Sequence, residues 1–406
     1  MAKYLARYAE PEVGNLSWIK GHWDTVVCIP ACQEDDSLVE TLEKMSAVKA
    51  ADKALAVVVI NGSEDADPAV HQANQQAAEQ LRFRCQMDAE RDSLGKLGCL
   101  SVLLLDRFSV ERLLPQGQGV GLARKIACDV ALALVADGRV LGPWIRCTDA
   151  DVEVPDDYFL SLPNGLAGEG VSAAIYPFVH VPEGDALQKE AMRLYEAYLY
   201  YYVAGLKRAG SPYAYHTIGS LIAINATSYA VVRGFPKRQA GEDFYLLNKL
   251  AKVGRVVQAE GTPVEIRGRV SHRVPFGTGA AVQTIRAQLA AGSDYQVYHP
   301  KVFDALGVWL QALQDFSNDP SLDSLRKTIH TASDDWGEQL LLALEGQGAF
   351  SAVLKASEQV SGKQLFRRLM EWFDAFRTMK LIHALRDMGL GEVSLVDLEA
   401  APNSAQ

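Results

Sequence analysis

The first 150 residues alternate between short apolar runs and longer segments with helical periodicity. Each short run is apolar almost throughout, as expected of a strand buried on both faces of a sheet. The predicted strands are Thr25–Ile29, Leu55–Ile60, Leu100–Leu105 and Trp144–Cys147. The predicted helices between them are Ser37–Lys49, Ala69–Arg84 and Gly121–Ala136. Apolar strands separated by helices indicate an α/β fold, a mostly parallel sheet flanked by helices.

Beyond residue 151 the alternation becomes less regular, and from about Tyr295 the pattern is helical to the end of the chain. The elements expected in between are a strand at Val171–Pro177, a tyrosine-rich helix at Ala186–Leu206, a loop and strand over His216–Asn225, a helix at Glu242–Val253, and strand and turn over Val256–Ile266. We therefore predict an N-terminal extension over 1–23, an α/β domain over 24–290 and a helical C-terminal region over 291–406.

The composition is typical of a globular protein and argues against nucleic-acid-binding and membrane-spanning classes. The chain has 406 residues, of which 49% are hydrophobic and 22% charged, as in ordinary globular proteins. Its net charge of −10 argues against a nucleic-acid-binding protein. No apolar run reaches the roughly 18 residues of a transmembrane helix, and the N-terminus lacks the apolar core of a secretory signal. The six cysteines match no zinc-ligand spacing, so we expect reduced thiols and a cytoplasmic location.

Two carboxylates, Asp149 and Asp151, directly follow the predicted strand Trp144–Cys147. Side chains two apart in an extended segment point to the same side. Oxygen ligands of this kind suit Mg²⁺ or Mn²⁺, which often bind substrate phosphates as well, although an aspartate-rich turn without a ligand is the alternative. Pro30–Glu34 and Asn61–Asp65 follow the first two strands, and ligands of parallel sheets bind at these carboxyl ends. The shared location favours a single site.

Three further motifs are candidates for chemistry. Glu242 and Asp243 open a predicted helix, where acids either stabilise the helix dipole or supply a general base. The glycine-rich segment Gly117–Gly121 precedes Arg124 and could bind an anion, but its spacing does not match a dinucleotide fingerprint. His272 lies in a polar loop and is either a third metal ligand or a surface histidine.

The order of these segments resembles the family-two, GT-A-type nucleotide-sugar glycosyltransferases. The resemblance covers about residues 24–275. It rests on Val26–Glu34, Val59–Asp65, Gly121–Lys125, Thr148–Asp151 and Gly241–Asp243. Thr148–Asp151 matches the DxD motif of the family, and Gly241–Asp243 matches its acidic acceptor-side motif. The resemblance implies a GT-A, Rossmann-like sheet, and the helical C-terminus has no part in it.

The resemblance also implies an activity and a set of roles. The chain would be an enzyme, a hexosyltransferase-like glycosyltransferase that uses Mn²⁺ or Mg²⁺ to move a sugar from a nucleoside-diphosphate donor to an acceptor hydroxyl with inversion. It implies that Pro30, Ala31 and Glu34 line the nucleoside pocket, that Asn61 lies near the base and that Arg124 contacts the nucleotide. Asp149 would face the ribose or a metal-bound water, and Asp151 would bind the metal. Asp243 would be the general base, with Glu242 beside it.

Two departures from the family keep alternatives open. The family often carries two acids where this chain has Ile60 and Asn61, so the nucleotide base of the donor stays open between uracil, guanine and others. His272 resembles the metal-binding histidine of some retaining GT-A enzymes that make glucosyl- or mannosyl-glycerate compounds, so a retaining transferase is an alternative. A non-catalytic nucleotide-sugar-binding protein is another. The helical C-terminal region is a candidate surface for homo-oligomer formation.

Overall fold

A computed structural model describes residues 1–34, 36–87, 92–162, 164–268 and 277–400. The chain forms two compact units, the first made of Met1–Gly184 and Thr217–Ala280 and the second of Asp185–His216 and Ala281–Gln406. This division differs from the predicted boundaries, because the tyrosine-rich helix packs with the C-terminal helices and the N-terminal extension belongs to the first unit.

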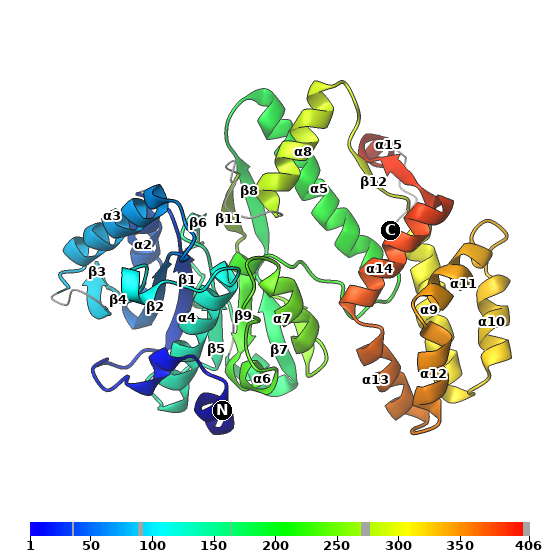
Figure 1. Cartoon of the computed structure of the whole chain (residues 1–406), viewed down its shortest axis with the longest axis horizontal. Helices are drawn as coiled ribbons and strands as arrows, with labels where there is room; N and C mark the ends of the chain where they lie inside the picture. The colour runs from blue at the N-terminus through cyan, green and yellow to red at the C-terminus, as the bar shows by residue number, and fades with distance from the viewer. Residues whose placement is uncertain (35, 88–91, 163, 269–276, 401–406) are drawn as a thin grey trace. The chain divides into compact units, whose positions relative to one another are not determined.

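The described part of the first unit is built on an eight-stranded sheet of order β10-β7-β9-β5-β1-β2-β4-β3 (Figure 1). Its strands are β1 (Thr25–Ala31), β2 (Ala54–Asn61), β3 (Ser93–Leu97), β4 (Leu100–Arg107), β5 (Trp144–Cys147), β7 (Val171–Ile175), β9 (Ile222–Asn225) and β10 (Arg255–Gln258). Strands β5, β1, β2 and β4 run parallel, and β10 is parallel to β7, whereas β3 and β9 are antiparallel to their neighbours. The predicted α/β fold with a mostly parallel sheet is confirmed.

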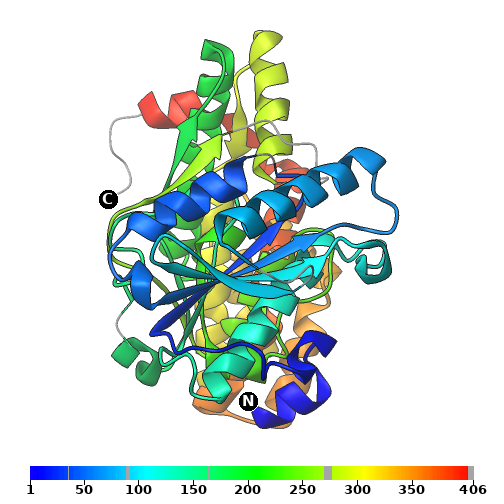
Figure 2. The ribbon, with the colours of Figure 1, turned by 90° about the vertical axis from the view of Figure 1, so that its left-hand side faces the viewer.

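The helices of the first unit cover both faces of this sheet. They are α1 (Ala2–Arg7), α2 (Ser37–Ala47), α3 (Pro68–Arg84), α4 (Gly119–Ala136), α6 (Ala226–Val231) and α7 (Glu242–Leu250). Helices α2 and α3 lie on one face and α4 lies on the other (Figure 2). Connections between parallel strands are right-handed, so the direction in which the chain moves along the sheet decides which face its helix covers. From β1 to β2 and β4 the chain moves one way, and α2 and α3 lie on one face. From β4 to β5 it moves back to the other side of β1, so α4 lies on the opposite face. The strand order therefore reverses beside β1, and such a switch point is where open α/β sheets bind ligands.

A second, three-stranded sheet in the first unit has the order β6-β11-β8. Its strands are β6 (Val152–Glu153), β8 (Phe178–Pro182) and β11 (Val264–Gly268). Strand β6 begins directly after Asp151, so this small sheet fixes where the chain goes once it has passed the acid pair.

The N-terminal segment is tied to α4 through the buried carboxylate of Asp129. Its two oxygens accept hydrogen bonds from the Tyr4 hydroxyl (2.6 Å), the Tyr229 hydroxyl (2.9 Å), the Lys125 ammonium (2.8 Å) and the backbone N–H of Glu10 (2.8 Å). A buried charge is tolerated only when it is paired and hydrogen-bonded in this way. The extension is therefore an integral part of the first unit.

The second unit is mainly helical, as predicted for the C-terminal region. Its elements are α5 (Ala186–Arg208), most of α8 (Thr278–Ala290), α9 (Lys301–Asn318), α10 (Leu322–His330), α11 (Gly337–Gly346), α12 (Ala349–Ser357), α13 (Gly362–Trp372), α14 (Ala375–Leu385), α15 (Leu395–Ala400), and the strands β12 (Gln296–Tyr298) and β13 (Glu392–Ser394). Its core is aromatic, with the rings of Trp309 and Phe373 fully buried and 5.8 Å apart between centroids.

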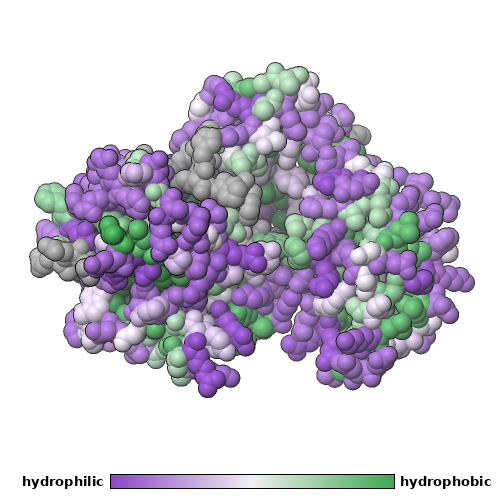
Figure 3. Space-filling model, viewed as in Figure 1, coloured by the Kyte–Doolittle hydropathy of each residue, from purple (hydrophilic) through white to green (hydrophobic). Residues whose placement is uncertain are grey.

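Within the described residues, no helix combines the length and apolar character needed to cross a membrane. Figure 3 shows mostly hydrophilic residues on the face that it draws, with hydrophobic residues in small separate patches.

Candidate active site

The acid pair leaves the sheet at the switch point. Pairing between β5 and β1 ends where the Thr148 N–H donates to the Cys28 carbonyl at 3.1 Å. In the next three residues Ala150 is buried, whereas Asp149 and Asp151 are partly exposed. This alternation leaves both carboxylates accessible from the carboxyl edge of the sheet, which is the arrangement a cation or a substrate needs.

Arg124, on α4, connects the acid pair to the acids that begin α7. Its guanidinium donates to Asp149 Oδ1 (2.5 Å), to Glu242 Oε1 (2.9 Å) and to the carbonyl of Gly219 (3.0 Å). Burial acts to lower the pKa of Arg124, but the carboxylates of Asp149 and Glu242 outweigh it and raise that pKa. The arginine is only 3% exposed, so it holds two distant acidic motifs in a fixed relation. Its contact with a nucleotide stays a prediction.

The close approach of Arg124 depends on a glycine. A Cβ atom added to Gly219 would lie 2.6 Å from Arg124 Nη2 and 2.9 Å from its Cζ. Because three hydrogen bonds fix the guanidinium, it has little freedom to move aside. Gly219 is thus part of the site, and nothing in its local sequence indicated this.

Asp243 lies in the first turn of α7, after Gly241, whose φ of 72° begins the helix. Burial and then the negative charge of Glu242 raise the pKa of Asp243 to about 7, while the Phe244 N–H and Arg124 act in the opposite direction. The Phe244 N–H donates to Asp243 Oδ1 at 2.7 Å. A carboxyl group that titrates near neutral pH is well matched to general base catalysis, a property that a helix-capping role does not require.

The end of β1 differs from the expected loop. Pro30 and Ala31 belong to the strand, which continues along β2, and both are buried. Proline is tolerated because its missing N–H would face β5, and pairing with β5 has already ended at Cys28. Glu34 is 5% exposed and accepts a hydrogen bond from the Ser37 hydroxyl at 3.1 Å. Nucleoside contact by these residues remains a prediction.

Asn74, on α3, joins the chain after β1 to the end of β2. Its Oδ1 accepts the N–H of Gln33 (2.8 Å), and its Nδ2 donates to the carbonyl of Asn61 (2.9 Å). Gln33 has a φ of 54°, in the left-handed region, so its backbone is held in a conformation that is unfavourable for a non-glycine residue. Asn74 is 1% exposed and Asn61 is 5% exposed. One buried amide therefore sets the relative position of the two predicted nucleoside-binding segments.

The positioning role of Asn74 was not predicted from the sequence, although its place on the helix indicates that it is buried. It shares a helical stripe with Ala77, Ala78 and Leu81, the other buried residues of α3. A polar residue on the buried stripe of a helix requires hydrogen-bond partners, and here the partners are loop backbone groups.

Gly121, in the glycine-rich helix start, serves packing, and anion binding by the segment Gly117–Gly121 stays a prediction. The Gly121 N–H donates to the carbonyl of Arg238 at 3.0 Å. An added Cβ would lie 2.5 Å from that oxygen and 2.6 Å from the carbonyl of Pro236. The glycine lets α4 approach the backbone before α7 closely enough for Arg124 to reach Glu242.

The donor set at this edge fits a hard cation that is bound together with a substrate. In the ranges that the structure describes, no group of three or more histidine, cysteine, aspartate or glutamate side chains is placed to hold a metal ion. Asp149 and Asp151 supply two carboxylates, and enzymes commonly hold Mg²⁺ through one or two carboxylates plus substrate phosphates. His272, the predicted third ligand, lies outside the described residues.

Comparisons with known proteins give the following results. The chain matches no protein-family model and no curated protein sequence. Among solved structures it is similar to S. aureus TarS 1–349 in complex with UDP-GlcNAc, with a TM-score of 0.40, 13% identity, and coverage of 88% of this chain and 92% of that chain. It is also similar to the mannosyltransferase PcManGT from Pyrobaculum calidifontis in complex with GDP-Man and Mn²⁺, with a TM-score of 0.39, 17% identity, and coverage of 96% and 92%. Because these TM-scores are below 0.5, the functional assignment rests on the geometry of the site.

Proposed function

We propose that this protein is a metal-dependent glycosyltransferase that moves a sugar from a nucleoside-diphosphate donor to an acceptor hydroxyl with inversion. The observation that carries the proposal is the arrangement around Arg124, which fixes Asp149, at the switch point of the sheet, to Glu242 at the start of α7. The proposal is supported by Asp243, whose pKa is raised to about 7 by burial, by the charge of Glu242 and in part by the charge of Asp149.

Asp151 and Asp149 would hold Mg²⁺ or Mn²⁺, which supplies positive charge that stabilises a departing diphosphate. Asp151 is the predicted metal ligand, and Asp149 is predicted to face the ribose or a metal-bound water. Asp149 already accepts one hydrogen bond from Arg124, so its orientation is fixed before any ligand binds. Such preorganisation lowers the cost of assembling the charged site.

Asp243 acts as the general base. It takes the proton of the acceptor hydroxyl as the oxygen forms a bond to the anomeric carbon, and the bond from that carbon to the diphosphate oxygen breaks. Attack on the face opposite the leaving group inverts the anomeric configuration. Glu242 does not take the proton, since it is buried and held by Arg124, but its charge keeps the pKa of Asp243 near neutral.

The metal role is tested by substituting Asp151. In the wild type, Mn²⁺ together with UDP or GDP is expected to raise the melting temperature by a few degrees above either ligand alone, because ligands that bind the native state stabilise it. Asp151→Asn removes a charged ligand, so we expect this additional rise to disappear and sugar transfer to be lost. Thermal melts and a donor-turnover assay measure the two effects.

Asp156→Asn is the matched control, because Asp156 is an exposed aspartate five positions further on, beyond β6. It should keep both the Mn²⁺-dependent stabilisation and the transfer activity. Full metal-dependent stabilisation and turnover in Asp151→Asn would contradict the metal role. NMR of the product distinguishes inversion from retention by its anomeric configuration.

Asn74→Ala is expected to raise the KM for the donor about tenfold while kcat changes little, since the two hydrogen bonds that position the nucleoside-binding segments are lost. The free energy of unfolding should also fall, by about 1–3 kcal/mol. The control is Ala77→Gly, on the same buried stripe, which destabilises α3 by about 1 kcal/mol but leaves these bonds intact. Steady-state kinetics would speak against the positioning role if both variants changed KM equally.

A further inference from the structure

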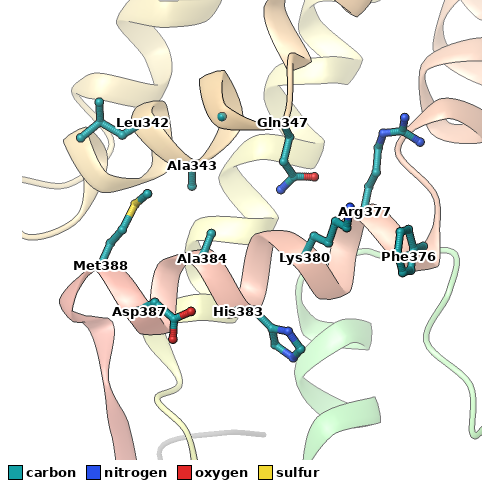
Figure 4. A pocket seen from close by; sticks show the side chains of 11 residues that line it. Leu342, Ala343, Gln347, Phe376, Arg377, Lys380, His383, Ala384, Asp387 and Met388 are labelled. Atoms are coloured by element: carbon teal, nitrogen blue, oxygen red, sulfur yellow. The ribbon is translucent and has the colours of Figure 1, made fainter.

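The second unit contains a cavity of about 590 Å³ between α11 and α14 (Figure 4). Its volume lies in the range of small-molecule sites, about 300–1,000 Å³. All of its lining residues belong to the helical unit, so it is separate from the proposed active site, and nothing in the proposed function uses it.

Two cations line one end of this cavity. Arg377 donates to the carbonyl of Trp372 at 3.0 Å and lies 4.5 Å from the centroid of the Trp372 ring. Lys380 lies 4.7 Å from the centroid of the Phe376 ring. Among the described residues, neither cation forms a salt bridge with a carboxylate. Aromatic faces and a carbonyl hold these cations in place without neutralising them.

A buried amide faces the same space. Neither Oε1 nor Nε2 of Gln347 has a hydrogen-bond partner in the described structure, and both atoms are buried. Figure 4 shows the Gln347 side chain pointing from the end of α11 toward α14, on the side of Lys380. An unpaired buried amide is costly, so a ligand that supplied hydrogen-bond partners here would recover free energy.

The other titratable groups of the lining leave this positive charge in excess. Asp387 pairs with Arg386, whose Nε lies 2.8 Å from its Oδ1, and this contact lowers the pKa of Asp387. Arg386 Nη1 also lies 3.9 Å from Glu392 Oε1. Burial lowers the pKa of His383, which is therefore neutral at neutral pH, and its Nε2 lies 2.8 Å from the Tyr298 hydroxyl. The lining therefore holds two cations, Arg377 and Lys380, and one carboxylate, Asp387.

The opposite end of the cavity carries exposed apolar side chains beside Asp387. Leu342 and Met388 are 52% and 43% exposed. Figure 4 shows both of them at the end away from Arg377, with Ala343 and Ala384 between the two ends. The cavity thus has a cationic end and an end where Leu342 and Met388 lie beside Asp387.

We propose that this cavity binds a small phosphate monoester of an apolar alcohol. The phosphate oxygens pair with Arg377 and Lys380 and accept a hydrogen bond from the Gln347 amide. A phosphate suits this set better than a carboxylate does, since its three terminal oxygens can meet three separate donors. The apolar part of the ligand packs on Leu342 and Met388, which removes their exposed surface from water.

Calorimetric titration of the full chain with hexyl phosphate tests the proposal. The buffer contains EDTA, so that no divalent cation can recruit phosphate to Asp149 and Asp151. We expect binding to a single site, with an affinity about tenfold higher than that of inorganic phosphate, because only the ester reaches the exposed apolar side chains. Lys380→Gln should weaken hexyl phosphate binding about tenfold. Lys355→Gln, an exposed lysine on α12 outside the cavity, should leave it unchanged.

Gln347→Leu separates a binding role from a structural one. Because the amide has no partner in the folded chain, its loss should not lower the melting temperature, yet hexyl phosphate should bind several-fold more weakly. The absence of hexyl phosphate binding to the wild type, equal affinity for Lys380→Gln, or equal affinity for inorganic phosphate would each overturn the proposal. Loss of binding in Asp151→Asn would also overturn it, by placing the phosphate at the other site.

Discussion

Asp243→Asn should reduce kcat for sugar transfer by about 10²–10⁴-fold, the usual contribution of a general base, while the affinity for the donor is retained. The amide has nearly the same shape as the carboxyl group and can still accept the Phe244 N–H, so α7 keeps its start. It cannot take the proton of the acceptor hydroxyl. Steady-state kinetics together with a donor-binding measurement separate the two effects.

The pH dependence gives an independent check on Asp243. Only the ionised carboxylate can accept a proton, so transfer by the wild type should rise with pH and level off above an inflection near 7. The pKa is raised on folding, so between about 4 and 7 the folded state holds a proton that the unfolded state has lost. Stability therefore falls as pH rises through this window, and Asp243→Asn should lack this fall. Thermal unfolding at pH 5 and pH 8 measures the difference.

Asp323→Asn provides a matched control, since Asp323 occupies the same position in the first turn of α10 that Asp243 occupies in α7. Both substitutions weaken a favourable helix-dipole interaction, but only the one at Asp243 should stop transfer. Equal losses of donor binding and turnover in Asp243→Asn would assign the residue a structural role.

The elements that could be predicted from the sequence are those whose own residues show a clear pattern of apolar and polar positions. Every residue of β1 and β2 is buried, so each strand appears in the sequence as a continuous apolar run. Strand β3 was missed because it lies at the edge of the sheet, where Gly95 and Lys96 interrupt any apolar pattern. The assignment of the tyrosine-rich helix to the helical unit was missed because only its packing partners, distant in sequence, reveal it.

The same distinction applies to the candidate site. Asp149, Asp151 and Asp243 could be proposed from the sequence because each stands at the end of a strand or the start of a helix, where acids are informative. The links between these acids were not found. Arg124 lies 118 positions from Glu242 and 95 positions from Gly219, and no spacing rule connects residues so far apart. The contacts that hold the candidate site together are a tertiary property, whereas its proposed reactive groups have local sequence signals.

Arg124→Gln should have the largest effect on stability, a loss of about 3–5 kcal/mol, because the Glu242 carboxylate stays buried without its cation. Arg124→Lys should lose less, since it keeps the charge but not the three-donor geometry. In the double variant Arg124→Gln with Glu242→Gln, part of the loss should be recovered, because no buried charge is then left unpaired. Chemical denaturation of the three variants measures these differences.

The pH profile connects this stability effect to catalysis. Arg124 lowers the pKa of Asp243 and Glu242 raises it. Removal of the cation in Arg124→Gln should therefore move the inflection of transfer activity to higher pH, and Glu242→Gln should move it to lower pH. Arg124→Lys, which keeps the positive charge, should leave the inflection close to that of the wild type. If the inflection stayed near 7 in both charge-removing variants, the titrating group would not be Asp243, because a carboxyl group this close to both side chains must respond to the loss of either charge.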